Sequence, residues 1–306
     1  MRRRAKRTMW FLVGGTLVLV AVVIGLFIYI SNQSSGGPGS TSSTYPTSPA
    51  NAALVKEITT VNLSVLAAVG TGSGLVQTPP AKISGSPPLL TGSNGKPEVF
   101  YDGGEYCPYC AAERWAMIVA LSRFGSFHNL SQESSSPSDV YPNTPTFSFF
   151  HSSYSSQYLD FVPVEGQSYQ GVTLQQLTSD QEQLVTIYNS GGSIPFVDIA
   201  NRYVITGASY DPQVLSGLDW QGVANALSDP QSPVAQAILG TANDLTAALC
   251  QATNQQPTSV CQTAPIPQVE RALNQSTGNS GGNDRQVNTT ESVAVVRQSH
   301  AASLEE

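Results

Sequence analysis

The sequence is poor in charged residues, which make up 11% of its 306 positions, against roughly 25% in an average soluble domain. Five of the 14 cations lie within residues 1–7, and no acid does. The rest of the chain therefore holds nine cations against 21 acids, a net charge near −12. Because phosphate binding needs the opposite sign, the sequence argues against a nucleic acid as partner.

Metal-ligating residues are also scarce, with three histidines and four cysteines. His128, His151 and His300 follow no ligand spacing. A zinc site made of the four cysteines is a poor interpretation, because the ten residues between Cys250 and Cys261 exceed the short knuckle that tetrahedral zinc favours. The sequence therefore predicts neither a metal ion nor a cofactor.

Long apolar runs are missing except for one, Met9–Ile30, which has 22 residues without a charge and follows the basic residues 1–8. It is long enough to cross about 30 Å of hydrocarbon. It exceeds the apolar run of a cleaved signal peptide, and no small-residue cleavage pattern follows it. Since the cations precede it, we expect a single-pass anchor at 9–30 in the cell membrane, with the N-terminus cytoplasmic and the main domain extracytoplasmic.

Composition divides the remaining chain into three parts. Residues 31–51 are rich in Ser, Gly and Pro and are predicted to be a flexible stalk. Residues 277–306 are polar and are predicted to be a disordered tail. Residues 52–276 are predicted to fold as one domain.

The pattern of this domain predicts an α/β fold. A strand at 96–104 ends on two glycines, and a helix at 110–124, apolar around most of its circumference, follows it. Further strands are expected at 146–151 and 158–164, a capped helix at 179–192, and a hairpin of strands 196–199 and 203–206. Residues 219–274 are predicted to be mostly helical, with breaks at Pro230 and Pro233.

The motif "CPYC" lies between the first strand and its helix. A thiol at a helix start is stabilised as a thiolate by free backbone N–H groups and the helix dipole. We therefore predict Cys107 as the nucleophile and Cys110, one turn inside, as the resolving thiol. Pro108 stiffens the loop, and Tyr109 modulates the reduction potential.

Carboxylates flank the dithiol on both sides. One of them beside such a pair can accept the proton of the resolving thiol, and Asp102 and Glu105 are candidates. The favoured interpretation is instead that Asp102 and Glu105 are solvated turn acids and that Glu113 is a helix-start glutamate, which the dipole stabilises.

The second cysteine pair, Cys250 and Cys261, is separated by a polar loop with one proline. In an oxidising compartment this spacing predicts a structural disulfide, worth about 3 kcal/mol. A second redox pair is disfavoured because neither cysteine has a helix-start position.

The order strand, "CPYC", helix, strand, helix, then Ile194-Pro195 before a hairpin resembles the thioredoxin fold. The resemblance implies a three-layer sandwich, here with inserted segments and extra C-terminal helices. It also implies a cis peptide before Pro195 that packs against the dithiol and offers a backbone edge to substrate. Tyr106 stands where that family usually has tryptophan, and the insert 126–143 is longer than in a minimal thioredoxin.

A closer resemblance is to an uncharacterised family, domain of unknown function 929, over residues 54–262. The passages that carry it are "GKPEVFYDGGEYCPYCAAERWAMIVALSRFG", "YPNTPTFSFFHSSYSSQYLDFVPVE", "IPFVDIANRYV" and "TANDLTAALC". Its members are membrane-anchored and thioredoxin-like, so membership implies fold and redox character without naming a substrate.

The sequence thus predicts a membrane-anchored thiol-disulfide oxidoreductase that acts on protein disulfides, with protein thiols or a redox partner protein and the lipid bilayer as partners. The alternative is a non-enzymatic binding or assembly module in which Cys107 and Cys110 form a permanent structural bridge. A metal-binding module is a third hypothesis. Oxidases, isomerases and reductases share these residues, so the direction of electron flow is open.

Overall fold

The computed structural model describes residues 48–276. The predicted basic segment 1–8, membrane span 9–30, most of the stalk and the tail 277–306 lie outside these residues. Within residues 48–276 no single helix is long and apolar enough to cross a membrane. Helices 52–59 and 63–69 pass that test only as a pair, and they are bent by 56°.

The central sheet has five strands in the order β2-β10-β9-β3-β8. They are β2 (Ala81–Lys82), β3 (Glu98–Gly103), β8 (Asp160–Glu165), β9 (Phe196–Ile199) and β10 (Tyr203–Thr206). Strand β3 lies inside the sheet, where it pairs parallel with the edge strand β8 and antiparallel with the middle strand β9. It is buried along most of its length, as a strand covered on both faces must be. Residues that follow β3 therefore emerge between the ends of two neighbouring strands.

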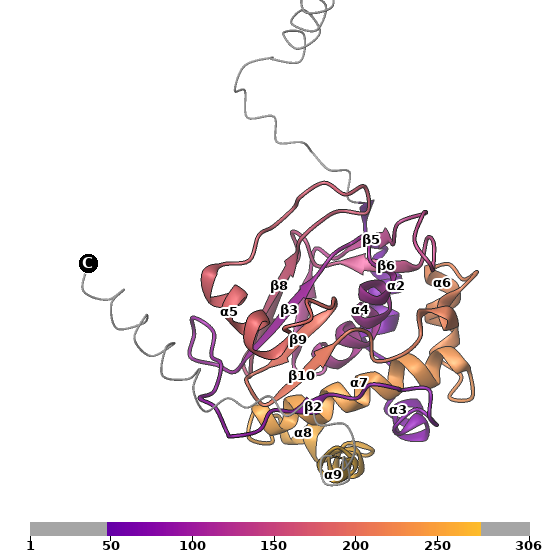
Figure 1. The fold of residues 1–306 in the computed structure, drawn as a ribbon. Helices are drawn as coiled ribbons and strands as arrows, with labels where there is room; N and C mark the ends of the chain where they lie inside the picture. Colours follow the sequence, from indigo (N-terminus) through magenta and orange to yellow (C-terminus); the bar gives the residue numbers. More distant parts are fainter. Residues whose placement is uncertain (1–47, 277–306) are drawn as a thin grey trace, which may run out of the picture. The chain divides into compact units, whose positions relative to one another are not determined.

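Helices cover both faces of this sheet, with α5 on one side and α4 and α7 on the other (Figure 1). The helices are α2 (Ala52–Thr59), α3 (Leu63–Val69), α4 (Pro108–Leu121), α5 (Ser179–Tyr188), α6 (Trp220–Ala226), α7 (Pro233–Ala252), α8 (Thr258–Cys261) and α9 (Ile266–Ser276), with a 3₁₀ turn η1 at Pro212–Leu215. The larger core lies under α4 and α7 and the smaller one under α5. The prediction of an α/β fold is confirmed.

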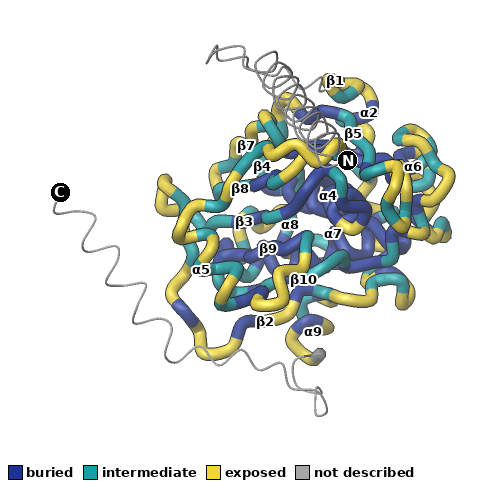
Figure 2. Tube along the Cα trace, turned by 45° about the horizontal axis from the view of Figure 1, so that its top comes forward, coloured by how far each residue is buried: buried dark blue, intermediate teal, exposed yellow. Residues whose placement is uncertain are grey.

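Helix α4 begins directly at the dithiol. Cys107 is its N-cap and Pro108 its first residue, where a missing N–H costs nothing. Every residue from Cys110 to Leu121 is buried, so α4, like α7, lies at the centre of the domain (Figure 2). The helix starts two residues earlier than predicted and ends three earlier.

Helix α7 packs closely against the segment after α3. A Cβ on Gly240 would lie 2.7 Å from the Cα of Gly72, which is closer than side chains approach a backbone. Gly240 is thus a close-packing position rather than a break. The amide of Asn243 also donates to the carbonyls of Leu66 and Gly70, at 2.9 and 2.8 Å.

The segment between α4 and β8, which contains the insert, folds together with β1 into two small sheets, β1-β5-β6 and β4-β7. Their strands are β1 (Ser48–Pro49), β4 (Gly125–His128), β5 (Ser131–Ser134), β6 (Pro145–Ser148) and β7 (Ser153–Ser156). Two expectations are corrected here. Residues 48–51 were assigned to the stalk, but β1 pairs with β5 and Asn51 caps α2. The serine-rich residues between the strands expected at 146–151 and 158–164 were predicted to be a connection, but they contain β7, since pairing with β4 overrides the weak strand preference of serine.

A disulfide joins Cys250 in the last turn of α7 to Cys261 at the end of α8, with the Cα atoms 5.5 Å apart. Both half-cystines are buried. The bridge closes an 11-residue separation and so limits the unfolded chain.

We expect the double variant Cys250→Ala with Cys261→Ala to lose about 3 kcal/mol of the free energy of unfolding, because its unfolded state is less restricted. Urea unfolding of the full chain, followed by fluorescence, measures this loss. A double variant as stable as the wild type would contradict the structural role of the bridge.

Candidate functional site

The turn between β3 and α4 holds the dithiol in place. The Glu105 amide donates to the Gln167 carbonyl at 2.8 Å, which ties the turn to the loop after β8. The Ser136 amide donates to the Tyr106 carbonyl at 2.8 Å, which ties it to the insert. Backbone bonds from two separate segments therefore fix the residues immediately before Cys107.

Cys107 and Cys110 are free thiols in the structure. Cys107 is 6% exposed and Cys110 is fully buried, so Cys107 alone reaches the surface. The Cys107 Sγ accepts a hydrogen bond from the Cys110 amide at 3.2 Å. The Cys107 thiol also donates to the Ile194 carbonyl oxygen, at 3.9 Å. The structure thus brings the predicted nucleophile, the resolving thiol and Ile194 together.

The two thiols differ in acidity. A hydrogen bond from the Cys110 thiol lowers the pKa of Cys107 below its ordinary value, burial opposes this, and the Cys110 amide and the Arg114 charge act in the same direction as the thiol. Burial raises the pKa of Cys110 well above its ordinary value. The first cysteine is therefore the better thiolate, and the second holds its proton.

The other predicted site residues lie around this pair. Pro195 is buried, and the Ile194-Pro195 peptide is cis. Pro108 is buried at the helix start. Tyr109 is 39% exposed, and its ring meets that of Tyr141 from the insert edge-on, with centroids 5.8 Å apart. Tyr109 therefore contacts the insert rather than the core.

Glu105 and Glu113 are fully buried and Asp102 is half-buried within β3, so the expectation of two solvated turn acids was wrong. Glu105 is fully buried; its Oε1 accepts from the Ser148 hydroxyl at 2.5 Å, while its Oε2 has no partner within residues 48–276. Burial raises the pKa of Glu105 to about 7. Glu113 is fully buried on α4, where it accepts from the amide and hydroxyl of Ser209, at 2.8 and 3.2 Å.

A buried ion pair that the sequence analysis did not find lies next to the dithiol. Arg114, one turn beyond Cys110, donates from Nε and Nη2 to the two carboxylate oxygens of Glu165, at 2.8 and 2.6 Å. Both side chains are fully buried. The Arg114 charge lowers the pKa of both thiols, though for Cys110 burial outweighs it. The available signal was an arginine inside a mostly apolar helix. A buried arginine requires a buried partner.

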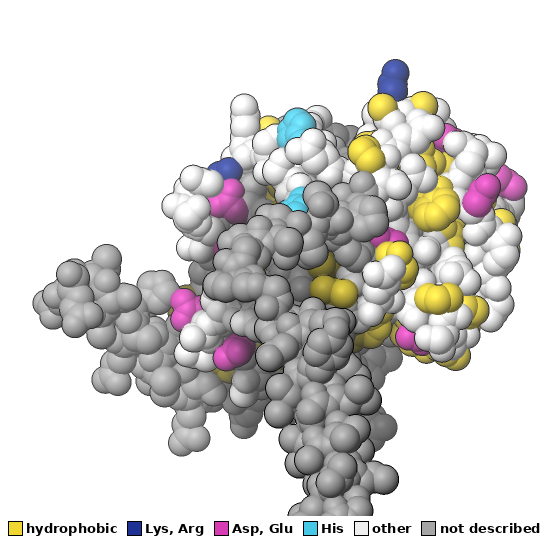
Figure 3. Space-filling model, turned by 90° about the horizontal axis from the view of Figure 1, so that it is seen from above, with side chains coloured by type: hydrophobic (Ala, Val, Ile, Leu, Met, Phe, Trp, Pro, Cys, Tyr) yellow, Lys and Arg dark blue, Asp and Glu magenta, His cyan; other side chains and the backbone are white. Residues whose placement is uncertain are grey.

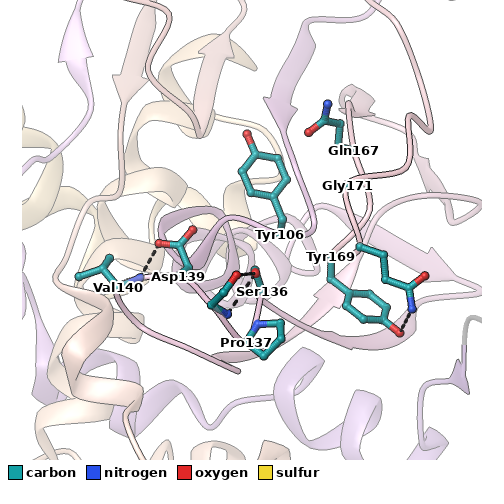
Figure 4. A pocket seen from close by; sticks show the side chains of 10 residues that line it. Tyr106, Ser136, Pro137, Asp139, Val140, Gln167, Tyr169 and Gly171 are labelled. Atoms are coloured by element: carbon teal, nitrogen blue, oxygen red, sulfur yellow. Dashed lines mark hydrogen bonds between the residues drawn. The ribbon is translucent and has the colours of Figure 1, made fainter. Parts of the chain in front are cut away.

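A groove of about 840 Å³ is lined by Tyr106, the residue before Cys107 in the chain. Tyr106 stands between its two walls, which are residues 136–140 of the insert and residues 167–171 after β8 (Figure 4). Asp139 is the one charged residue that lines it. The face drawn in Figure 3 likewise has mostly uncharged side chains, with few cations.

Four buried carboxyl groups make the free energy of unfolding depend on pH, because burial raises the pKa of each to about 7. They are Glu105, Glu113, Asp198 and Asp244. A carboxyl whose pKa is raised by folding stabilises the native state below its unfolded pKa, and this contribution is lost as the pH rises through the folded pKa. The free energy of unfolding should therefore fall from about pH 5 to about pH 7, by up to about 1.4 kcal/mol per pH unit for each group.

The variant Glu113→Gln removes one of these groups and should flatten the fall in that pH range. Urea unfolding at pH 5, 6, 7 and 8 measures the slope, and Glu182→Gln, at an exposed position on α5, is the control. A slope that is equal in the wild type and Glu113→Gln would contradict the assignment.

Within residues 48–276 no group of three or more His, Cys, Asp or Glu side chains could hold a metal ion. A protein-family model described as "Domain of unknown function (DUF929)" matches residues 81–251, more than half of the chain. The matched region runs from β2 to the last turn of α7 and contains both thiols and the groove. No curated protein and no solved structure matches the chain.

Proposed function

The chain belongs to the family described as Domain of unknown function (DUF929), and on that premise we propose that it is a thiol-disulfide oxidoreductase that acts on protein disulfides. One observation carries the proposal: a free thiol, Cys107, caps a helix that is buried from Cys110 to Leu121, and it reaches the surface beside the Ile194 carbonyl. A helix-start thiol with a lowered pKa is the reactive kind of cysteine.

We infer a thioredoxin-like fold as its scaffold. Supporting this, the motif follows the interior strand β3, which has a parallel neighbour β8 and an antiparallel neighbour β9. Ile194-Pro195 directly precedes β9, and helices lie on both faces of the sheet. The insert with its two small sheets and the C-terminal helices α7 to α9 are additions to that scaffold.

The proposed reaction follows from the difference in pKa between the Cys107 and Cys110 thiols. The Cys107 thiolate attacks one sulfur of a partner disulfide; the partner's S–S bond breaks, one partner thiolate leaves, and a mixed disulfide forms. Cys110 then loses its proton and attacks Cys107 Sγ, which releases the second partner thiolate and leaves a Cys107–Cys110 disulfide. The partner gains two electrons and the pair loses them, and the reverse sequence oxidises a partner dithiol.

Glu105 is the proposed acceptor for the Cys110 proton. It lies in the turn before Cys107, it is fully buried, and one carboxylate oxygen has no partner within the described chain. A pKa of about 7 suits a group that must take up and return a proton near neutral pH.

The same proposal places the protein on the outer side of the cell membrane, anchored by residues 9–30. The apolar length of this segment and the cations before it support that topology. The Cys250–Cys261 disulfide fits an oxidising compartment.

A disulfide-exchange assay tests the function. The full chain, reduced or oxidised, is mixed with a fluorescent peptide that carries two cysteines, as disulfide or dithiol respectively. We expect Cys107→Ser to lower the exchange rate at least about 100-fold, while Cys250→Ala with Cys261→Ala keeps it. Equal rates for the wild type and Cys107→Ser would refute the proposed oxidoreductase activity. The alternative, a binding module in which Cys107 and Cys110 form a permanent bridge, would then remain.

A further inference from the structure

Tyr101 has a buried hydroxyl that no step of the proposed reaction uses. The residue belongs to β3, is fully buried and lies in the larger core, on the sheet face that α4 covers. Its hydroxyl oxygen is buried and makes no hydrogen bond within residues 48–276. A buried hydroxyl without a partner costs free energy, so its place in the structure calls for an explanation.

The ring of Tyr101 has neighbours that fix its direction. The Phe149 ring meets it edge-on, with centroids 5.3 Å apart, and the Arg114 guanidinium carbon lies 5.8 Å from its centroid. The hydroxyl reaches along the strand to Gly103, because a Cβ on Gly103 would collide with the hydroxyl oxygen and lie 2.5 Å from the adjoining ring carbon. Gly103 therefore leaves the space that the hydroxyl fills.

This end of β3 is also next to the resolving thiol. Burial raises the pKa of Cys110, and a hydrogen bond from the backbone of Gly104, the residue after Gly103, opposes that effect. Burial likewise raises the pKa of Tyr101, and negative charge on Cys110 or Cys107 raises it further. The hydroxyl and the Cys110 sulfur are therefore electrostatic neighbours at the two glycines that end the strand.

The acidity of Tyr101 makes its hydroxyl a hydrogen-bond donor. Because burial holds its pKa well above the ordinary value, the hydroxyl keeps its proton throughout the neutral range. Cys110, by contrast, has to become a thiolate in a site where burial opposes the charge. A neutral donor beside a buried anion stabilises it without adding another buried charge.

We propose that the Tyr101 hydroxyl donates a hydrogen bond to the Cys110 thiolate during the resolving step, a role that rests on the proposed oxidoreductase function. Cys110 gives its proton to Glu105 and its sulfur attacks Cys107 Sγ. The bond between Cys107 and the partner sulfur then breaks, and the partner leaves as a thiolate. Tyr101 transfers neither a proton nor an electron. It raises the thiolate fraction of Cys110, which outweighs the smaller loss of nucleophilicity.

Rapid mixing of the reduced full chain with oxidised glutathione tests this role. Acid quenching at set times and mass spectrometry give the fraction of the chain that carries glutathione on Cys107. At pH 7 we expect this adduct to resolve at least about threefold more slowly in Tyr101→Phe than in the wild type. The pH profile of resolution should move up by about one unit or more, because the Cys110 thiolate has lost a donor.

The first step of the reaction should not respond to the same change. In the Cys110→Ser background, which cannot resolve the adduct, glutathione should attach to Cys107 at rates that agree within about twofold with and without Tyr101→Phe. An effect on resolution alone assigns the hydroxyl to Cys110 rather than to Cys107.

Tyr210→Phe is the matched control, because it removes another buried tyrosine hydroxyl that contacts α4. That hydroxyl donates to the Ala112 carbonyl at 2.6 Å, so its loss should lower the urea midpoint of unfolding and leave the resolution rate at the wild-type value. Tyr101→Phe should show the opposite combination, with slower resolution and a urea midpoint that is unchanged or higher, since the hydroxyl that it removes has no partner within residues 48–276.

Failure of this role and failure of the oxidoreductase give different results. If Cys110→Ser carries no glutathione on Cys107, the oxidoreductase function is refuted and the role of Tyr101 with it. If Cys110→Ser carries the adduct but Tyr101→Phe resolves it as fast as the wild type, the role of Tyr101 alone is overturned. Equal slowing in Tyr210→Phe, or a Tyr101→Phe chain that unfolds at a lower urea concentration than the wild type, would overturn it as well.

Discussion

Replacing Cys110 with serine is expected to stop the reaction at the mixed disulfide. In the wild type, Cys110 lies one helical turn beyond Cys107, and its amide donates to the Cys107 sulfur at 3.2 Å. A thiol held one helical turn away resolves the adduct far faster than a second molecule can. A serine hydroxyl in its place has no sulfur to attack with, so the adduct persists.

Oxidised glutathione is a suitable probe for this effect. After incubation of the full chain, acid quenching and peptide mass spectrometry should show Cys107 carrying glutathione in Cys110→Ser. The wild type should instead show a Cys107–Cys110 disulfide and little adduct, because the second step is fast. The double variant Cys107→Ser with Cys110→Ser is the control and should carry no adduct in this turn.

An adduct on Cys110 in the single variant Cys107→Ser, together with no adduct on Cys107 in Cys110→Ser, would reverse the assigned roles. This outcome conflicts with the burial of the two residues, since Cys107 is 6% exposed and Cys110 is fully buried. The experiment therefore tests the division of labour between the thiols as well as their reactivity.

Replacing Arg114 with methionine is expected to lower the free energy of unfolding by about 3 to 5 kcal/mol, because it leaves the Glu165 carboxylate buried without its partner. The loss comes from the unpaired charge rather than from the missing contact. Urea unfolding of the full chain at pH 7 measures it.

The double variant Arg114→Met with Glu165→Leu separates these two causes. Removing both charges should restore most of the stability, since apolar side chains of similar size can replace a buried pair at little cost. The Phe149 amide, which donates to Glu165 at 3.3 Å, would lose its acceptor and keep the recovery incomplete. A loss of stability below about 1 kcal/mol in Arg114→Met would contradict the assignment of Arg114 and Glu165 as a fully buried ion pair.

Arg114 also connects stability with chemistry. Its charge lowers the pKa of Cys107, so Arg114→Met should raise that pKa and reduce the thiolate fraction at neutral pH. The absorbance of the thiolate near 240 nm, followed against pH, reports this change independently of stability.

The sequence predicted the order of strands and helices around the dithiol because each element has a strong local signal. The strand before Cys107 ends on Gly103 and Gly104, and α4 begins at an N-cap followed by proline. Ile194-Pro195 was identified through the resemblance to the thioredoxin fold, by its place before a hairpin. Local signals of this kind need no knowledge of what packs against them.

The features that were missed depend on segments far apart in the chain. Glu105 was expected in solvent, but Ser148 and the loop at Gln167 cover it. Glu165, the partner of Arg114, is 51 residues away, and no local pattern connects the two. The groove arises because an insert and a distant loop are both hydrogen-bonded to the same turn. Burial and pairing of this kind become visible only with the tertiary structure.

The most direct test of the central claim is the reduction potential of Cys107 and Cys110. The full chain is equilibrated in glutathione buffers of graded potential, quenched in acid, and its free thiols are counted by mass after alkylation. The account predicts that both thiols appear together in one two-electron transition between about −270 and −120 mV, the range of known thiol-disulfide oxidoreductases. A thiol count at these two cysteines that stays constant across the whole range would contradict it.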